Sequence, residues 1–152
     1  MGHIGGEAQI DLDVPIAEVF AALADIEAAP EWQDGLDAAV ALERDESGRA
    51  SLVRTESDIK VKRIKGTLRF SYDEPVLVAW SQVDGDMKAV EGSWKLEDLG
   101  DGRTRVKYAL DTDPGRVLSM VIRGPVEAAT RELFVSRRPG ELASWLQQRS
   151  GA

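Results

Sequence analysis

Residue types that could perform catalysis are few in this chain of 152 residues. It contains no cysteine and one histidine, His3, so thiolate chemistry, thiolate metal sites and multi-histidine metal centres are excluded. The polar residues left for acid and base chemistry on otherwise apolar predicted strands are Thr55, Ser57, Gln82 and Tyr108. Each is better explained as a strand residue near a sheet edge or as a core group with a hydrogen-bond partner. No residue is therefore assigned a catalytic role.

Two pairs of carboxylates have the close spacing of metal ligands, Asp84 with Asp86 and Asp111 with Asp113. Both pairs lie beside glycine or proline at the ends of predicted strands, where turn chemistry accounts for acidic residues. We therefore expect no bound metal ion and no cofactor. A basic run could contact an anionic membrane or protein, but it lacks interleaved aromatic residues. Its members are Lys60, Lys62, Arg63 and Lys65.

Composition and length restrict the class of protein. The 43% hydrophobic and 30% charged residues are ordinary for a globular domain, and no apolar run approaches the roughly 20 residues of a membrane span. The length predicts one domain, and we expect flexible termini at 1–5 and 150–152. A net charge of -8 argues against a nucleic-acid partner. Without a secretory signal, we expect a cytoplasmic monomer or weak homodimer.

The elements that would position these residues begin with a strand, because apolar and polar residues alternate over 7–13. Pro15 then suits the first position of a helix. An apolar stripe follows at i, i+3, i+4 and i+7, formed by Ile16, Val19, Phe20 and Leu23. Pro30 interrupts the continuation of this helix, so Trp32 is expected on a short turn.

From Leu36 onward, alternating stretches separated by turn residues predict six antiparallel strands. Their expected ranges are 36–44, 50–58, 60–72, 76–83, 87–97 and 103–111. Beyond residue 115 the apolar period becomes helical, which predicts a long C-terminal helix broken near Pro139. This order of elements predicts an α+β fold in which the last helix covers one face of the sheet.

Three stretches of the chain are similar to one known family. They are Asp-Ile-Glu-Ala-Ala-Pro-Glu-Trp at 25–32, Val-Pro-Ile-Ala-Glu-Val at 14–19 and Gly-Ser-Trp-Lys-Leu at 92–96. The sequence resembles the polyketide cyclase/dehydrase branch of the START-like (SRPBCC, Bet v 1-like) superfamily over about residues 6–149. The resemblance implies a helix-grip fold: a seven-stranded antiparallel sheet wrapped around a long C-terminal helix, two short helices after the first strand, and a ligand cavity between sheet and helix.

Within that fold, the period of two along each strand predicts which side chains face the cavity. The residues expected to bind the ligand are Trp32, Leu36, Val40, Leu42, Leu68, Phe70, Trp80, Trp94, Tyr108, Leu110 and Leu133. We expect Trp32 at the mouth, facing Trp80 and Trp94, so that the pocket has aromatic walls. The alternative for each aromatic residue is ordinary core packing.

The resemblance implies binding of a hydrophobic small molecule, such as a lipid, a quinone or a polyketide-like ring system, by a carrier or sensor. The alternative is a polyketide cyclase or dehydrase (aromatase) that acts on a poly-ketone by acid/base catalysis with Tyr108 and its neighbours. Aromatase/cyclases of the family have a proposed catalytic tyrosine after the turn, where this chain has Leu36. That difference favours binding. A protein-interaction domain, with a large exposed apolar patch, is a third hypothesis.

Overall fold

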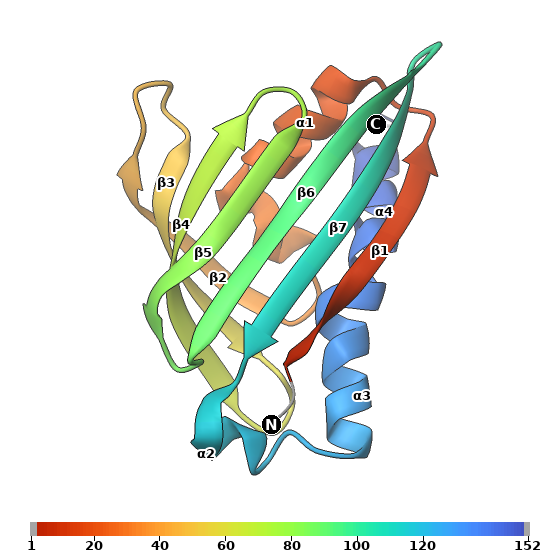
Figure 1. The fold of residues 1–152 in the computed structure, drawn as a ribbon. Helices are drawn as coiled ribbons and strands as arrows, with labels where there is room; N and C mark the ends of the chain where they lie inside the picture. The colour runs from red at the N-terminus through yellow and green to blue at the C-terminus, as the bar shows by residue number, and fades with distance from the viewer. Residues whose placement is uncertain (1–2, 151–152) are drawn as a thin grey trace.

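Seven strands form one antiparallel sheet in the computed structural model, which describes residues 3–150 (Figure 1). The order across the sheet is β1-β7-β6-β5-β4-β3-β2, so the first strand lies beside the last. The strands are β1 Ile4–Leu12, β2 Leu36–Arg44, β3 Ala50–Asp58, β4 Arg63–Asp73, β5 Leu77–Gly85, β6 Ala89–Gly100 and β7 Arg103–Asp113. The predicted seven-stranded sheet is confirmed, and β2 and β3 have the predicted bounds.

The turn between β3 and β4 contains neither glycine nor proline. Lys60 takes the left-handed conformation there, with φ of 79°. Its backbone N–H donates a hydrogen bond of 2.8 Å to the Asp58 side chain, and the N–H of Ile59 donates one of 3.1 Å to the carbonyl of Lys62. These two bonds close the turn locally, as Asp side chains often do. For this reason β4 begins at Arg63 and not at the predicted residue 60.

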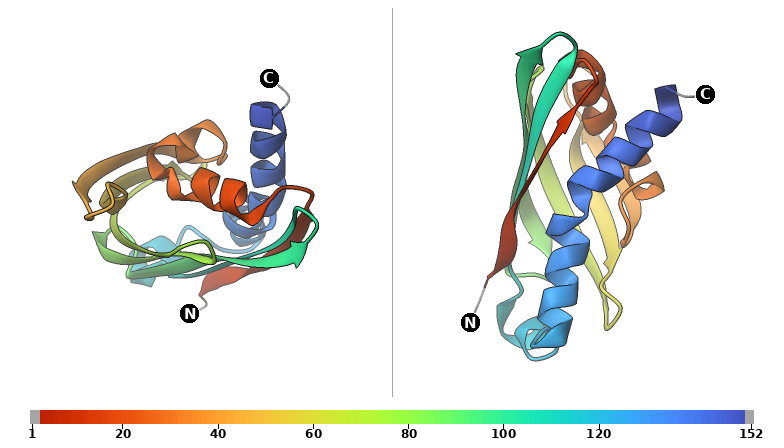
Figure 2. Two further views of the ribbon diagram at one scale, coloured as in Figure 1. Left: turned by 90° about the horizontal axis from the view of Figure 1, so that it is seen from above. Right: turned by 90° about the vertical axis from the view of Figure 1, so that its right-hand side faces the viewer.

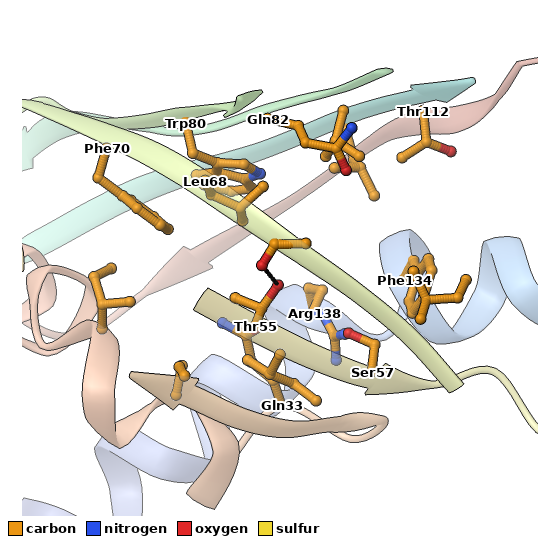
Figure 3. Close-up of a pocket in the computed structure, with 18 of the residues that line it drawn as sticks. Gln33, Thr55, Ser57, Leu68, Phe70, Trp80, Gln82, Thr112, Phe134 and Arg138 are labelled. Atoms are coloured by element: carbon orange, nitrogen blue, oxygen red, sulfur yellow. Dashed lines mark hydrogen bonds between the residues drawn. The ribbon is translucent and has the colours of Figure 1, made fainter. Parts of the chain in front are cut away.

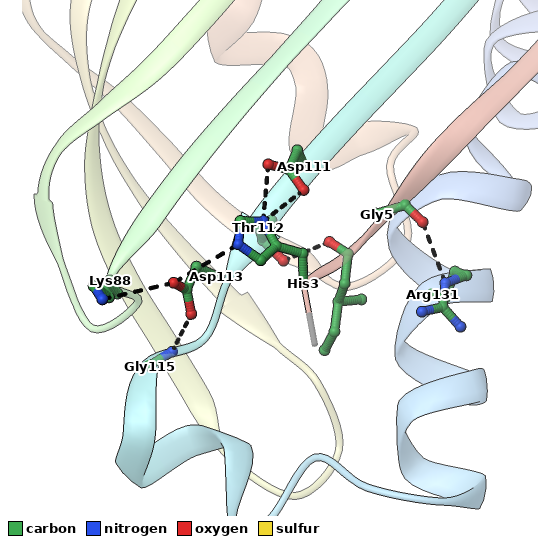
Figure 4. A network of polar contacts seen from close by, with 9 residues as sticks. His3, Gly5, Lys88, Asp111, Thr112, Asp113, Gly115 and Arg131 are labelled. Atoms are coloured by element: carbon green, nitrogen blue, oxygen red, sulfur yellow. Dashed lines mark hydrogen bonds and ion pairs between the residues drawn. The ribbon is translucent and has the colours of Figure 1, made fainter. Parts of the chain in front are cut away.

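The N-terminal end of the chain belongs to the sheet (Figure 4). Ile4 pairs with Thr112, whose hydroxyl donates a hydrogen bond of 2.7 Å to the carbonyl of Ile4. The Nδ1 atom of His3 lies 2.9 Å from a carboxylate oxygen of Asp111. Residues 4 and 5, which lie within the segment predicted to be flexible, are therefore paired in the sheet. Residues 1, 2, 151 and 152 of the predicted flexible ends lie outside the described residues.

Two short helices follow β1, as predicted: α1 Ile16–Ala24 and the 3-10 helix η1 Ile26–Glu31. The apolar stripe of α1 is buried, with Val19, Phe20 and Leu23 between 0% and 3% exposed. The left view of Figure 2 shows the sheet curving around this helix, which contacts β5, β6 and β7. The helical pair therefore covers part of the concave face.

The C-terminal segment is helical from residue 125 to 150, after a short helix α2 Gly115–Ser119. It consists of α3 Pro125–Arg131, a π-helical turn η2 Glu132–Ser136 and α4 Arg138–Ser150. The bend in the right view of Figure 2 falls at this π turn and at Pro139, where a backbone N–H is missing. The predicted long, broken helix is thus present. Across residues 3–150, no helix has both the length and the apolar character needed to span a bilayer.

Candidate functional site

The concave face of the sheet and the helices that cover it enclose a cavity of about 140 Å³. Side chains from β2 to β7, from α1 and η1, and from the C-terminal helical segment line it (Figure 3). Of the lining residues, Lys65 is exposed and Ser57 and Gln82 are half-buried. The cavity therefore reaches the surface where β3 ends and β4 begins.

A hollow of this size has a measurable cost in stability. For a space of 140 Å³, a penalty of about 24 cal/mol per Å³ corresponds to roughly 3 kcal/mol. Net domain stabilities are only about 5–15 kcal/mol. An apolar cavity of about 150 Å³ takes up benzene. The space therefore suits one ring of that size, and a larger ligand must extend through the opening or displace side chains.

Six aromatic rings cross the inner face as a continuous row, which we call the aromatic row. Its members, in spatial order, are Tyr72, Phe70, Trp80, Tyr108, Trp94 and Trp32. The ring centroids of Trp94 and Tyr108 are 4.4 Å apart, and those of Phe70 and Trp80 are 5.6 Å apart. These separations are those of favourable, tilted aromatic pairs. Its four central rings, those of Phe70, Trp80, Tyr108 and Trp94, form one apolar wall of the cavity.

Trp80 lies flat against the neighbouring strand because its partner there has no side chain. Gly92 pairs directly with Trp80, and a Cβ atom at Gly92 would lie 2.3 Å from Cζ2 of the indole. Any larger residue at this position would push the ring away from the sheet and into the cavity. Gly92 therefore sets the depth of the cavity at its aromatic wall.

The structure brings most of the predicted ligand-binding residues together. Those that line the cavity are Leu36, Leu68, Phe70, Trp80, Trp94, Tyr108 and Leu110. Val40, Leu42, Trp32 and Leu133 do not line it. A role in binding stays a prediction for all of the lining residues.

Val40 and Leu42 point away from the cavity, and the expectation that they face inward is wrong. Each is 45% exposed, whereas the intervening positions of β2 face the core and Ala39 lines the cavity. The pairing of β2 with β3 shifts register between Leu36 and Ala38. A bulge of one residue reverses the faces of every position that follows it. Leu36 and Ala39 consequently share the inner face.

Trp32 and Leu133 are buried behind the cavity wall. Trp32 is 8% exposed, and its ring centroid lies 6.0 Å from that of Trp94, so it ends the aromatic row behind the lining ring of Trp94. Leu133 packs on Gly35, where an added Cβ would lie 2.9 Å from Cδ2 of the leucine. The next residue along the π turn, Phe134, lines the cavity in its place.

Several of the polar groups on the wall have partners within the protein. The Thr55 hydroxyl donates a hydrogen bond of 3.3 Å to the carbonyl of Gly66. The side-chain amide of Gln82 donates one of 2.8 Å to the carbonyl of Met87. Both thus act as structural hydrogen-bond donors, in agreement with the interpretation made from the sequence. No carboxylate or imidazole is present among the described residues that line the cavity.

Tyr108 is the polar group at the centre of the aromatic row. Burial raises the pKa of its hydroxyl to about 12, and the nearby Arg138 guanidinium offsets only part of that effect. Near neutral pH the hydroxyl therefore keeps its proton and can donate a hydrogen bond, but it cannot serve as a base.

Arg138 is the functional candidate that sequence reasoning missed. It lines the cavity although it is only 4% exposed. Its Nη1 group donates hydrogen bonds of 2.8 Å to the Glu141 carboxylate and 2.8 Å to the backbone carbonyl of Asp34. The signal in the sequence was its position, because Arg138 is four residues from both Phe134 and Leu142 on one face of the helix. A charged residue within a buried apolar stripe is rarely accidental.

Alkaline pH is expected to destabilise the protein through Tyr108. The folded state keeps a proton up to about pH 12, whereas the unfolded chain loses it near 10.0. Below the unfolded pKa, both states are protonated and stability does not depend on this group. Between the two values Tyr108 should contribute a fall of about 1.4 kcal/mol per pH unit to the free energy of unfolding. Urea denaturation followed by circular dichroism at a series of alkaline pH values measures this slope.

Tyr108→Phe provides the control for that measurement. Tyr72, whose pKa burial also raises to about 12, remains in the variant. The slope should therefore decrease without disappearing. If the substitution left the slope unchanged, Tyr108 would be titrating like an exposed tyrosine, and the account of its burial would be wrong.

Solved structures with the same architecture are numerous. A START superfamily protein from Mycobacterium smegmatis superposes with a TM-score of 0.81 at 20% identity, over 97% of this chain and 99% of that one. The Zhui aromatase/cyclase from Streptomyces sp. R1128 superposes with a TM-score of 0.74 at 17% identity, over 98% of this chain and 96% of that one. A protein from Thermus thermophilus superposes with a TM-score of 0.81 at 17% identity, over 96% of this chain and 99% of that one. At these identities the likeness concerns the fold, and it confirms the helix-grip architecture.

Sequence comparison identifies the family directly. No curated protein sequence matches the chain. The family model described as polyketide cyclase / dehydrase and lipid transport matches residues 12–137, which include α1, six of the strands and most of the cavity wall. The match covers well over half of the chain and agrees with the resemblance at 14–19, 25–32 and 92–96. This chain therefore belongs to the polyketide cyclase / dehydrase and lipid transport family.

Proposed function

We propose that this protein binds a hydrophobic small molecule in its internal cavity, as a carrier or sensor. The observation that supports this best is the combination of an aromatic, apolar wall with the lack of a carboxylate or imidazole among the described lining residues. A ligand that buries apolar surface there gains roughly 0.8 kcal/mol per CH₂ group. Affinity would then come from burial, with few polar contacts. A cytoplasmic location and a monomeric or weakly dimeric state are part of this proposal.

Cyclase or dehydrase activity is the alternative, because the family description and the Zhui aromatase/cyclase both name such chemistry. Enolisation and ring closure require a base to remove a proton and a donor to stabilise the oxyanion. Tyr108 and Arg138 could serve as donors. The described cavity wall offers no evident base, since the pKa of Tyr108 is raised and carboxylates are lacking. Binding is therefore the better supported function.

Native mass spectrometry of the purified protein tests the proposal. A protein that retains a ligand should show an added mass, and solvent extraction followed by mass analysis would identify the released molecule. The control is Ala39→Phe, which fills the cavity and should abolish the added mass. An added mass that persists in the control would place the ligand elsewhere. If neither protein had an added mass and neither bound aromatic probe molecules, the proposal would be wrong.

A further inference from the structure

We propose that Arg138 binds a neutral carbonyl oxygen of the ligand, which makes the ligand an apolar molecule with an uncharged ketone, ester or quinone group at its buried end. This inference rests on the proposed binding function and specifies its ligand class. It is derived from an unused donor in the cavity wall and from the balance of charges around it.

The unused donor is the Nε–H group of Arg138. Nε is buried and has no hydrogen-bond partner among the described residues. The side chain as a whole is 5% exposed, and it lines the cavity together with Thr55, Ser57 and Gln33, which Figure 3 draws on the side away from Phe70 and Trp80. A buried N–H without a partner is costly, and nearly all such groups in proteins are satisfied. An acceptor supplied by a ligand would satisfy this one.

The structural role of Arg138 does not use Nε. The guanidinium has a hydrogen bond with the Tyr108 side chain. Nη1 donates both to the carbonyl of Asp34 and to Glu141, and the second Glu141 oxygen accepts the Asp34 backbone N–H at 2.9 Å. These bonds fasten the turn after η1 to α4. Arg137 contributes to the same attachment through the Asp34 carboxylate at 3.0 Å, and it is exposed. Attachment of the turn therefore leaves the buried Nε–H of a cavity-lining side chain without a partner.

The local charges select a neutral acceptor. The Arg138 guanidinium is permanently positive, and the Glu141 carboxylate, 2.8 Å away, already compensates it. Tyr108 adds no charge, since its pKa is raised to about 12. A ligand carboxylate beside Arg138 would bring a second negative charge into a buried place of low dielectric, whereas Lys65, the other cation of the lining, is exposed to solvent. A carbonyl oxygen accepts a charge-assisted hydrogen bond from Nε without that penalty.

Three probes of similar size distinguish these possibilities: ethylbenzene, acetophenone and benzoate. They share one ring and differ in having no acceptor, a neutral carbonyl or a carboxylate. Titration into isotopically labelled protein, followed by nuclear magnetic resonance, yields the three affinities and reports the Arg138 Nε–H signal. We expect that signal to shift with acetophenone and not with ethylbenzene.

Arg138→Met keeps the apolar stem and removes the donor. The ratio of acetophenone to ethylbenzene affinity should fall about tenfold in this variant, the effect of one hydrogen bond to a charged group. Arg137→Met is the matched control, because it loosens the same turn from outside the cavity, and it should leave the ratio unchanged. An equal ratio in all three proteins would overturn the inference.

Glu141→Gln tests the charge balance and keeps the test valid if Arg138→Met fails to fold. Removing the compensating charge should raise benzoate affinity relative to acetophenone by about tenfold. An unchanged benzoate preference would overturn the claim that charge selects a neutral ligand.

If ethylbenzene and acetophenone both fail to bind the native protein, the proposed binding function itself is wrong. If both bind but Arg138→Met leaves the ratio of their affinities unchanged, only the inference about Arg138 is wrong.

Discussion

Ala39→Phe is expected to abolish binding of a benzene-sized ligand while the protein remains folded. Ala39 lines the cavity and is 9% exposed, so a phenylalanine ring placed there would occupy most of the 140 Å³. A ligand would have to displace that ring. Burial of a phenylalanine side chain contributes roughly 3 kcal/mol, so affinity should fall about a hundredfold. Titration of ethylbenzene followed by tryptophan fluorescence measures the loss.

The neighbouring residue provides the control for this experiment. Val40→Phe makes nearly the same change on the opposite face of β2, where Val40 is 45% exposed. Its affinity for ethylbenzene should equal that of the native protein. The pair also tests the bulge, because without the register shift after Leu36 the two results would be exchanged. Loss of binding in Val40→Phe and not in Ala39→Phe would therefore contradict the structure of this edge strand.

Trp94→Ala is expected to have the largest effect on stability. The side chain is 3% exposed and packs between Tyr108, with centroids 4.4 Å apart, and Trp32, with centroids 6.0 Å apart. Replacing a buried tryptophan with alanine removes its contacts and leaves a second hollow, which costs about 3–5 kcal/mol. That is a large share of a net stability of about 5–15 kcal/mol. Urea denaturation followed by far-ultraviolet circular dichroism measures it.

Trp80→Ala tests whether Trp80 acts as a residue of the cavity wall or as an ordinary core residue. Trp80 is only half-buried, and one side of its ring faces space that is already empty. Fewer packing contacts are lost, so the cost should be about half that of Trp94→Ala. In Trp80→Ala, the change in the free energy of ligand binding should exceed the change in the free energy of unfolding. Equal losses of stability in both variants would mean that the two rings have the same environment.

Local patterns in the sequence were sufficient for most of the architecture. The stripe at Ile16, Val19 and Phe20 predicted α1, because helical period and burial agree there. Turn residues predicted β2 and β3 to the residue. The turn at Lys60 was not predicted, since a non-glycine residue with φ of 79° has no compositional signal.

The candidate site was harder to predict because two of its features depend on tertiary structure. The bulge after Leu36 is set by pairing with β3, and a strict period of two therefore assigned Val40 and Leu42 to the wrong face. Arg138 was missed because an arginine in a helix is usually exposed. Its burial results from attachment to Asp34, more than a hundred residues earlier, and no local pattern indicates that contact.

The pairing of β1 with β7 has a consequence for how the chain acquires its structure. It joins residues 4–12 to residues 104–112, so the sheet is complete only when two distant parts of the chain meet. Such high contact order slows folding, because the entropy of a long loop is lost before the contacts form. On a ribosome that adds about 5–20 residues per second, β1 would wait roughly 5–20 seconds for its partner. During that interval the apolar inner face is open to chaperones, because the sheet cannot be completed before residues 104–112 have been made.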